Sequence, residues 1–191
     1  MELVTFLKQG PDGLEHGLAK WFADAWAKKV MNRGHRLISQ GDGDLMEYVL
    51  LGGRAASLIA DADGREVCVG LHVGPCVIPP NLARTRDGCS LISLDILEDC
   101  AVACMPAAAL SEMMLASVPV RAWANWVLRA ELSAKVDREW CLAALGGSAR
   151  LAWFRAHYPQ YEDMFQHRLI ATFLGLTAVT FSRLRAQADA S

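Results

Sequence analysis

The feature that most constrains the fold is a long stretch without glycine or proline, from Val120 to about Leu145. Both residue types break helices, so their absence over roughly 26 residues predicts one continuous helix about 39 Å long. Apolar and small side chains recur along it at alternating three- and four-residue steps, in a seam that Asp137 interrupts. A helix of this length with so narrow a seam is typical of helix–helix pairing.

Small residues in the middle of this stretch, at Ala130, Ser133 and Ala134, would let a second helix approach closely. We therefore predict a two-fold homodimer, the commonest closed assembly. The residues expected at its interface are Val120, Trp123, Val127, Ala130 and Ala134. The alternative is that the helix packs inside its own domain.

The pattern before this helix is that of short strands. Residues 1 to about 27 have helical spacing, whereas from about 28 to 105 apolar runs alternate with Gly and Asp turns such as Asp63-Gly64. Strands of this length between turns about every 8 to 12 residues indicate an antiparallel barrel or sandwich. The three predicted domains are residues 1–118 with the strands and flanking helices, 119–147 with the long helix and a Gly146-Gly147 hinge, and a helical unit over 148–191.

The composition excludes several classes of protein. The chain is 53% hydrophobic and 21% charged, which is too apolar for a disordered chain. A net charge of −2 excludes a globally basic coat and an acidic tail. No apolar run is long enough to span a bilayer and no secretory signal opens the chain, so we expect a cytoplasmic protein without a membrane partner. Catalytic motifs and metal-binding histidine spacings are also missing, and we expect no enzyme and no metal site.

The six cysteines form no Cys-x-x-Cys pair, and five of them fall between Cys68 and Cys104 in apolar surroundings. Free cysteine behaves there as a small hydrophobic residue. We expect reduced thiols in the core, and the alternative is a redox or metal sensor.

Residues 168–185 carry the clearest functional signal. Ile170 and Ala171 lie on one face of a first predicted helix, and Gly175 follows where a sharp turn needs a positive φ. Thr177 is a suitable N-cap for a second helix. In that helix Phe181 and Leu184 are predicted to point inward, with Ala178, Val179, Ser182, Arg183 and Ala186 on the opposite face. This pattern predicts a helix-turn-helix, although ordinary helical domains also contain such turns.

The order of these parts resembles the Crp/Fnr family of bacterial transcription regulators, in which a cyclic-nucleotide-type β-roll precedes a dimerisation helix and a winged helix-turn-helix. The resemblance covers about residues 21–187, and the β-roll turns that carry it are Gly41-Asp42, Gly53-Arg54, Asp63-Gly64 and Gly74. It implies an α+β fold, with an antiparallel β-roll of the double-stranded β-helix or jelly-roll type flanked by helices, a long dimerisation helix and a C-terminal helix-turn-helix. Because the sequence stops just after the second helix, we expect a short form without an evident wing.

Family members that bind cyclic AMP hold its ribose with a Gly-Glu pair and its phosphate with an Arg-Ser pair. Counted from Gly74, these positions are Ile78 and Pro79, then Cys89 and Ser90. A buried phosphate without its guanidinium loses several kcal/mol, on the order of the cost of an unpaired buried charge. We therefore expect no cyclic AMP binding by the usual mode. The tentative effector pocket consists of Val77, Ile78, Pro79, Pro80, Cys89 and Ser90.

The effector itself stays open at this point. The residues that could surround another small effector, a haem or a reactive thiol are His72, Cys76, Pro79 and Cys89, and the alternative is a packed, vestigial pocket. Iron–sulfur members of the family carry clustered N-terminal cysteines, but none precedes Cys68 here, so we expect no such cluster. A haem would need His35 or His72 as axial ligand, and lone histidines are more typical of a core or a surface.

The resemblance implies a homodimer whose two recognition helices lie about 34 Å apart and read an inverted repeat in double-stranded DNA. Arg183 is the candidate for a bidentate contact to guanine, and Ala178 and Val179 can contact thymine methyl groups. Residues suited to phosphate contacts are Thr177, Thr180, Ser182 and Arg185. RNA polymerase would be a further partner. The alternative function is a ligand-sensing or protein-interaction module that does not bind DNA.

Overall fold

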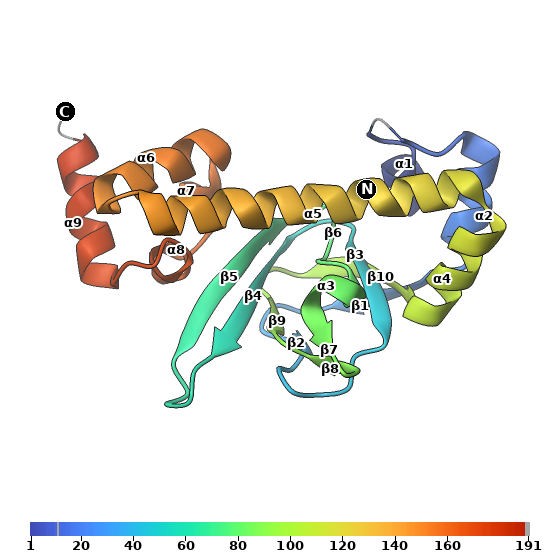
Figure 1. Cartoon of the computed structure of the whole chain (residues 1–191), viewed down its shortest axis with the longest axis horizontal. Helices are drawn as coiled ribbons and strands as arrows, with labels where there is room; N and C mark the ends of the chain where they lie inside the picture. The colour runs from blue at the N-terminus through green and yellow to red at the C-terminus, as the bar shows by residue number, and fades with distance from the viewer. Residues whose placement is uncertain (11, 190–191) are drawn as a thin grey trace.

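One helix, α5 (Val118–Ala144), runs along the long axis of the molecule, with strands below it and helical clusters at both ends (Figure 1). The computed structural model describes residues 1–10 and 12–189. The other helices are α1 (Leu3–Leu7), α2 (His16–Asp24), α3 (Asn81–Arg84), α4 (Ala107–Ala116), α6 (Gly147–His157), α7 (Tyr161–Met164), α8 (His167–Phe173) and α9 (Ala178–Asp189). The strands are β1 (Ala27–Met31), β2 (Arg36–Ile38), β3 (Met46–Leu50), β4 (Arg54–Ala60), β5 (Glu66–Val73), β6 (Cys76–Val77), β7 (Thr85–Arg86), β8 (Cys89–Ser90), β9 (Ser93–Ile96) and β10 (Cys100–Pro106).

The strands form two antiparallel four-stranded sheets, with orders β1-β10-β3-β6 and β2-β9-β4-β5, and β7 and β8 form a separate short hairpin. The strands therefore form two sheets rather than a closed barrel. Gly64 closes the β4–β5 hairpin with a φ of +76°, which supports the turn predicted at Asp63-Gly64. Burial does not simply alternate along the strands: β4 and β10 each bury four consecutive residues, because both of their faces are covered.

The long helix begins and ends where its sequence predicts. The Ser117 hydroxyl caps its first turn by accepting a bond from Val120 N at 3.5 Å, and Pro119 lies at the start of the helix, where no N–H is needed. Its last residue is Ala144, and α6 starts at Gly147. The break between the two helices therefore coincides with the predicted Gly146-Gly147 hinge.

The helical spacing predicted over residues 1 to about 27 corresponds to two short helices. This segment forms two short helices, α1 and α2, and the chain folds back between them, because Leu3, Leu7 and Leu14 all turn into one core. Trp26 lies beyond the end of α2 and is buried in the same core.

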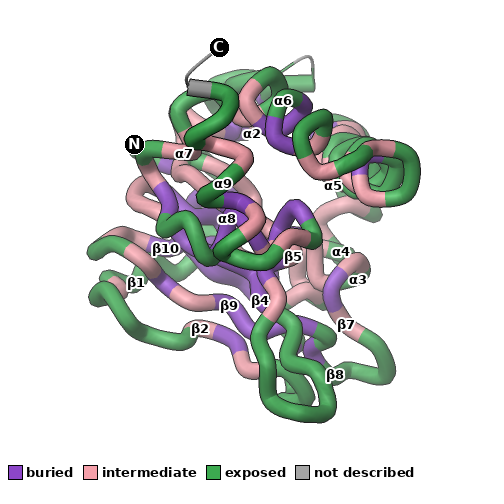
Figure 2. The backbone as a smooth tube through the Cα atoms, turned by 90° about the vertical axis from the view of Figure 1, so that its left-hand side faces the viewer, coloured by how far each residue is buried: buried purple, intermediate pink, exposed green. Residues whose placement is uncertain are grey.

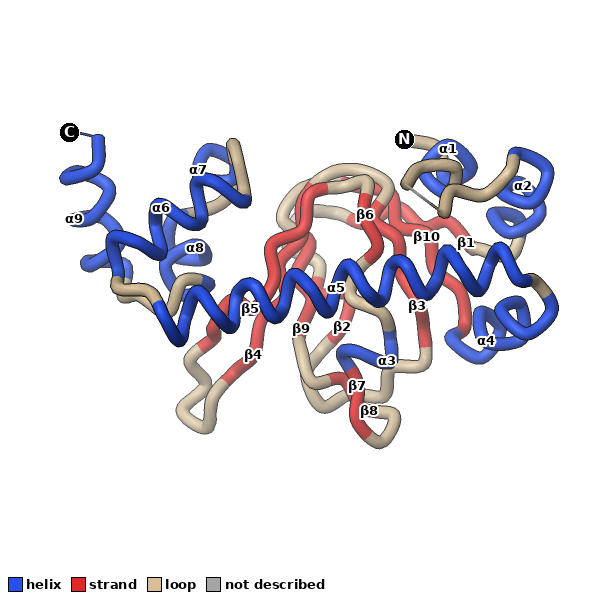
Figure 3. The backbone as a smooth tube through the Cα atoms, turned by 45° about the horizontal axis from the view of Figure 1, so that its top comes forward, coloured by secondary structure: helices blue, strands red, loops and turns tan. Residues whose placement is uncertain are grey.

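The buried residues form three clusters, which lie mainly between the sheets and the helices that cover them (Figures 2 and 3). One fills the space between the two sheets. A second joins the first sheet to α1, α2 and the beginning of α5. The third joins β4 and β5 to the C-terminal helices.

The C-terminal helices therefore share a core with the strands of their own chain. Cys68 N in β5 donates to the Thr172 hydroxyl of α8 at 3.1 Å, and Arg138 of α5 donates to the Phe173 carbonyl at 3.1 Å. Arg54 of β4 donates to the Met164 carbonyl. These bonds hold α8 against β5 and α5, and hold α7 against β4. Within residues 1–10 and 12–189, no single helix is both long and apolar enough to cross a membrane.

Candidate DNA-reading helix and effector cavity

Helices α8 and α9 meet at a bend of 99°, within the range of helix-turn-helix pairs. Gly175 makes the turn with a φ of +64°, as its sequence position predicts. The Leu176 N–H then donates to the Ala171 carbonyl at 2.8 Å, which satisfies a carbonyl at the end of α8. A Cβ at Gly175 would lie 3.1 Å from Arg150 Nη1, so Arg150 would have to move by a few tenths of an ångström to admit a side chain.

The second helix is capped and anchored as predicted. The Thr177 hydroxyl accepts from Thr180 N at 3.1 Å and donates to the Thr180 hydroxyl at 2.9 Å. Phe181 is 1% exposed and packs into the C-terminal core, with Leu184 partly buried against it. Because Phe181 and Leu184 face the core, the opposite face of α9 is exposed to solvent. This face carries Ala178, Val179, Ser182 and Arg183.

The two arginines of α9 differ in what they contact. Arg183 is exposed and makes no ion pair within the described part of the chain. Arg185 lies 2.7 Å from Glu162 of α7, which also pairs with Arg155 at 2.6 Å. The bond from Arg155, with a further bond from Arg185, lowers the pKa of the Glu162 carboxyl. In this structure the Arg185 side chain holds α9 to α7, and its phosphate contact stays a prediction.

The predicted dimer seam on α5 is partly wrong. Val120 and Trp123 are 0% and 2% exposed and belong to the core formed with α1 and α2. Val127 is half-buried at the edge of that core, whereas Ala130 and Ala134 are exposed. A straight helix has 3.6 residues per turn, so a seam of period 3.5 drifts around it, and the N-terminal helices cover its first part.

A different apolar stripe lies exposed on the same helix. Leu132, Val136 and Trp140 follow one another at four-residue steps and are 50%, 62% and 54% exposed. Four-residue steps place side chains on one face of a helix. An uncovered stripe of large apolar side chains marks an interaction surface.

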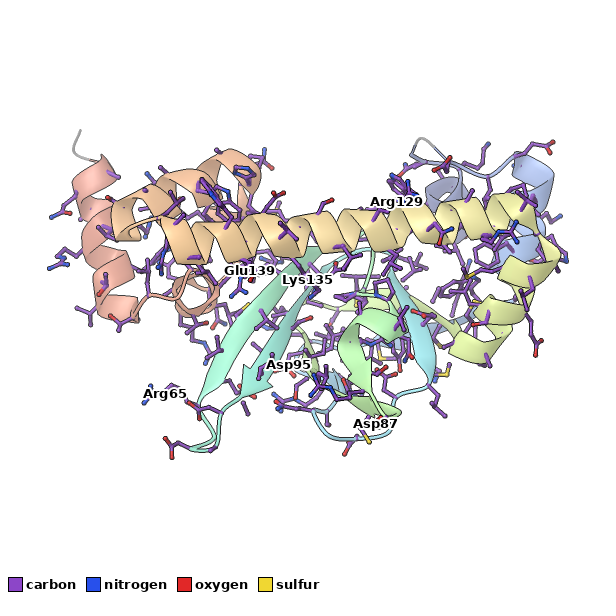
Figure 4. All side chains as sticks on the ribbon, viewed as in Figure 1. Arg65, Asp87, Asp95, Arg129, Lys135 and Glu139 are labelled. Carbon is purple, nitrogen blue, oxygen red and sulfur yellow. The ribbon has the colours of Figure 1, made fainter. Side chains whose placement is uncertain are left out.

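A cavity of about 740 Å³ lies between the second half of α5 and the faces of β4 and β5. Lys135 and Glu139 lie on the side of α5 turned toward these strands (Figure 4). The C-terminal unit completes the wall with Tyr158 and Phe173. The cavity therefore touches all three parts of the chain, so an occupant would contact the roll, the long helix and α8 together.

Three comparisons with known proteins bear on this arrangement. Neither the family models nor the curated proteins contain a match to this sequence. Among solved structures, FixK2 from Bradyrhizobium japonicum superposes with a TM-score of 0.75 at 18% identity, covering 86% of this chain and 85% of that chain. The c-di-GMP responsive global regulator CLP of Xanthomonas campestris gives 0.72 at 14% identity, covering 92% and 93%. A proposed transcriptional regulator of the Crp/Fnr family from Eubacterium rectale gives 0.68 at 17% identity, covering 93% and 84%.

The chain has the Crp/Fnr regulator fold. The predicted α+β architecture is thereby confirmed, with its antiparallel roll, flanking helices, long helix and C-terminal helix-turn-helix.

In this Crp/Fnr fold the tentative effector residues are scattered. Only Pro79 lines the 740 Å³ cavity. Ile78 is buried inside the roll, Ser90 is buried with its hydroxyl donating to the Ile92 carbonyl at 2.8 Å, and Cys89 is exposed. Val77 and Pro80 border a second cavity. The 740 Å³ cavity therefore gathers one of the six residues, and an effector role for the other five stays a prediction.

Arg84, which the sequence prediction omitted from the pocket, forms part of its wall but is not free to bind a ligand. Its Nε donates to Asp44 Oδ2 at 2.8 Å and its Nη2 to Asp44 Oδ1 at 3.2 Å, while the Pro79 and Met46 carbonyls accept its remaining bonds. The Arg84 and Asp44 side chains are 1% and 2% exposed. A cyclic phosphate placed here would have to compete with a buried bidentate carboxylate.

Several other polar and charged groups of the cavity also have partners within the chain. Lys135 pairs with Glu131 at 3.1 Å, and Arg138 bonds the Phe173 and Cys68 carbonyls. His72 shares a 2.8 Å bond with the Ser57 hydroxyl, and burial together with the Lys135 charge lowers its pKa to about 4. Arg84, Lys135 and Arg138 thus all have partners within the chain, and the absence of cyclic AMP binding by the usual mode stays a prediction.

Three of the six cysteines fit the expectation of core thiols, whereas Cys89 is exposed and Cys76 and Cys100 are partly exposed. Cys68, Cys104 and Cys141 are buried, and all six are free of disulfides. Burial raises the pKa of Cys68 and of Cys76 to about 12, so both thiols stay protonated near neutral pH. Within the described residues no group of three or more His, Cys, Asp or Glu side chains is placed to hold a metal ion.

Proposed function

We propose that this protein is a homodimeric, sequence-specific DNA-binding transcription regulator of the Crp/Fnr type that acts in the cytoplasm. The observation that carries the proposal is the exposed face of α9, on which Arg183 projects beyond a helix-turn-helix corner of 99°. A guanidinium that has no partner among the described residues can make a bidentate contact to guanine O6 and N7. Under this proposal double-stranded DNA is the main partner and RNA polymerase a second one.

The distribution of charge favours the same end of the molecule for DNA. The C-terminal unit from residue 148 onward holds five arginines and three acidic residues, a balance of +2. The remaining 14 basic and 18 acidic residues leave −4 for the rest of the chain. Because few cations face the DNA, we expect a shallow dependence of affinity on salt.

Dimerisation is proposed through the stripe of Leu132, Val136 and Trp140 rather than through Val120 and Trp123. Two copies paired along this stripe would bury its three large apolar side chains and direct both α9 helices to one face of the duplex. An inverted repeat is then the expected operator. The base preference should include thymine, because Ala178 and Val179 present only apolar groups.

The experiment selects bound fragments from genomic DNA and measures the affinity of the selected operator by fluorescence anisotropy at fixed salt. Arg183→Ala should weaken binding at least about tenfold, or about 1.4 kcal/mol. Arg65→Ala removes the same charge from the exposed β4–β5 turn and is the matched control, expected to bind within about twofold of the parent protein.

Two outcomes would contradict the proposal. Equal affinities of the Arg183→Ala and Arg65→Ala variants would remove Arg183 from base reading. Failure to retain any fragment would favour the second candidate, a ligand-sensing or protein-interaction module. That candidate is supported by Val179, which is 80% exposed at the start of α9 and suits a protein surface as well as a thymine methyl group.

A further inference from the structure

A second cavity, of about 350 Å³, lies on the other half of α5 and shares no residue with the first. It is enclosed by α3, α4, α5 and the edge of β3, with Leu110 and Met114 on one wall and Val127 on another. Trp26 and Trp123 contribute two indole rings. Its volume falls at the small end of the range, about 300–1,000 Å³, in which small-molecule sites occur.

Glu47 is the one charged side chain among the described residues that line this cavity, and no basic residue lines it. Glu47 is 7% exposed, and both of its carboxylate oxygens accept the Asn81 N–H, at 3.1 and 3.0 Å. These bonds leave lone pairs unused, since a carboxylate can accept about four hydrogen bonds.

The nearest cation does not neutralise Glu47. Arg84 Nη1 is 3.8 Å away, while the same guanidinium binds Asp44 at 2.8 Å through Nε. Two buried carboxylates thus share one buried arginine, and the direct hydrogen bonds go to Asp44. Burial raises the pKa of Glu47 in the absence of a second positive charge. A carboxylate in this position is complementary to an added cation.

The aromatic walls favour the same kind of ligand. Trp26 and Trp123 pack edge-to-face on Phe22, with ring centroids 5.8 and 5.5 Å apart, so both rings are held in place. Tryptophan faces attract ammonium groups more strongly than other aromatic rings do. The buried Trp26 Nε1–H also lacks an acceptor among the described residues.

We propose that this cavity binds a small organic cation, an amine with an apolar body, whose ammonium pairs with Glu47 and whose body lies between Trp123 and the α4 side chains. The site is independent of the proposed DNA-reading function, since it shares no residue with α9 or with the 740 Å³ cavity. Its ligand would bridge α3 and α4 to the first half of α5.

The test uses three probes with the same body and different charge: 2-phenylethylammonium, neutral 2-phenylethanol and anionic phenylacetate. Isothermal titration calorimetry of the full chain should show the cation binding at least about tenfold more tightly than either of the other probes. The Glu47→Gln and Ala124→Leu variants should each weaken cation binding about tenfold or more, because one removes the charge and the other fills the cavity.

Ala143→Leu is the matched control, since Ala143 lies on the same helix but lines the other cavity. It should leave cation binding unchanged. If Glu47→Gln does not fold by circular dichroism, Ala124→Leu still decides the question. Equal binding of the three probes, unchanged binding in Ala124→Leu, or no binding of the cation up to about 10 mM would each overturn the proposal.

Discussion

Replacing Arg84 by methionine should lower the free energy of unfolding more than replacing any exposed arginine does. Methionine keeps the apolar stem but removes the guanidinium that binds Asp44 at 2.8 and 3.2 Å. Asp44 is then left as a buried charge, 2% exposed in its side chain, with one remaining bond of 3.3 Å from Met46 N. Removing one partner of a buried ion pair lowers the free energy of unfolding by about 3–5 kcal/mol, a large share of the stability of a typical domain.

The matched control is Arg36→Met. Arg36 also has two acidic partners, Asp95 and Glu66, each at 2.7 Å, but its side chain is 40% exposed. Water replaces such bonds, so the loss should stay below about 1 kcal/mol. Both variants are unfolded in urea at one fixed protein concentration and followed by circular dichroism. With a slope of about 2 kcal/mol per molar urea, Arg84→Met should lower the midpoint by roughly 1.5–2.5 M.

A double variant, Asp44→Asn with Arg84→Met, tests the cause. It should be more stable than Arg84→Met alone, because the bare buried carboxylate is gone. Similar small losses for Arg84→Met and Arg36→Met would refute the reasoning. That result would also mean that the guanidinium is available at no cost, and a cyclic phosphate in the 740 Å³ cavity would again have a partner.

Three further outcomes follow from the same structure. Val136→Asp should convert the dimer to a monomer in light scattering, whereas Val30→Asp, at an 81% exposed position outside the stripe, should leave it dimeric. A dimer in both variants would show that the stripe is not the interface. Gly175→Ala should cost about 1–2 kcal/mol in urea unfolding because of its positive φ, and Gly146→Ala, with a φ of −76° and no atom near its added Cβ, should cost less; equal losses would argue against strain. Burial lowers the pKa of His72 from its ordinary 6.5 to about 4 in the folded chain, so the unfolded chain takes up the proton first as the pH falls. The free energy of unfolding should therefore be highest above pH 6.5 and fall toward pH 4 by at most about 1.4 kcal/mol per pH unit. The same pH dependence in the His72→Gln variant would exclude this histidine as the cause.

Much of the fold could be predicted from local signals. Gly and Pro positions delimited α5 to within a few residues, and Gly175 with Thr177 located the corner and the cap of the helix-turn-helix. These features depend on the backbone preferences of a few neighbouring residues, which a sequence displays directly.

The candidate sites were less predictable, because burial depends on segments far apart in the chain. Trp123 fits a dimer seam by its spacing, yet α1 and α2, about 100 residues earlier, cover it. Arg84 looks like a spare cation, but Asp44, 40 residues away, takes up its charge. Glu47 carries no motif, and its role emerges only from the walls of a cavity built by four elements.

The sequence alone therefore determined the order of the elements, the length of the central helix and the position of the helix-turn-helix near the C-terminus. The tertiary structure decided which face of that helix stays exposed, which arginine remains unpaired and which side chains meet in each cavity. The physical reason is range: periodicity and turn preferences act over a few residues. Desolvation and charge pairing, in contrast, depend on every segment that packs nearby.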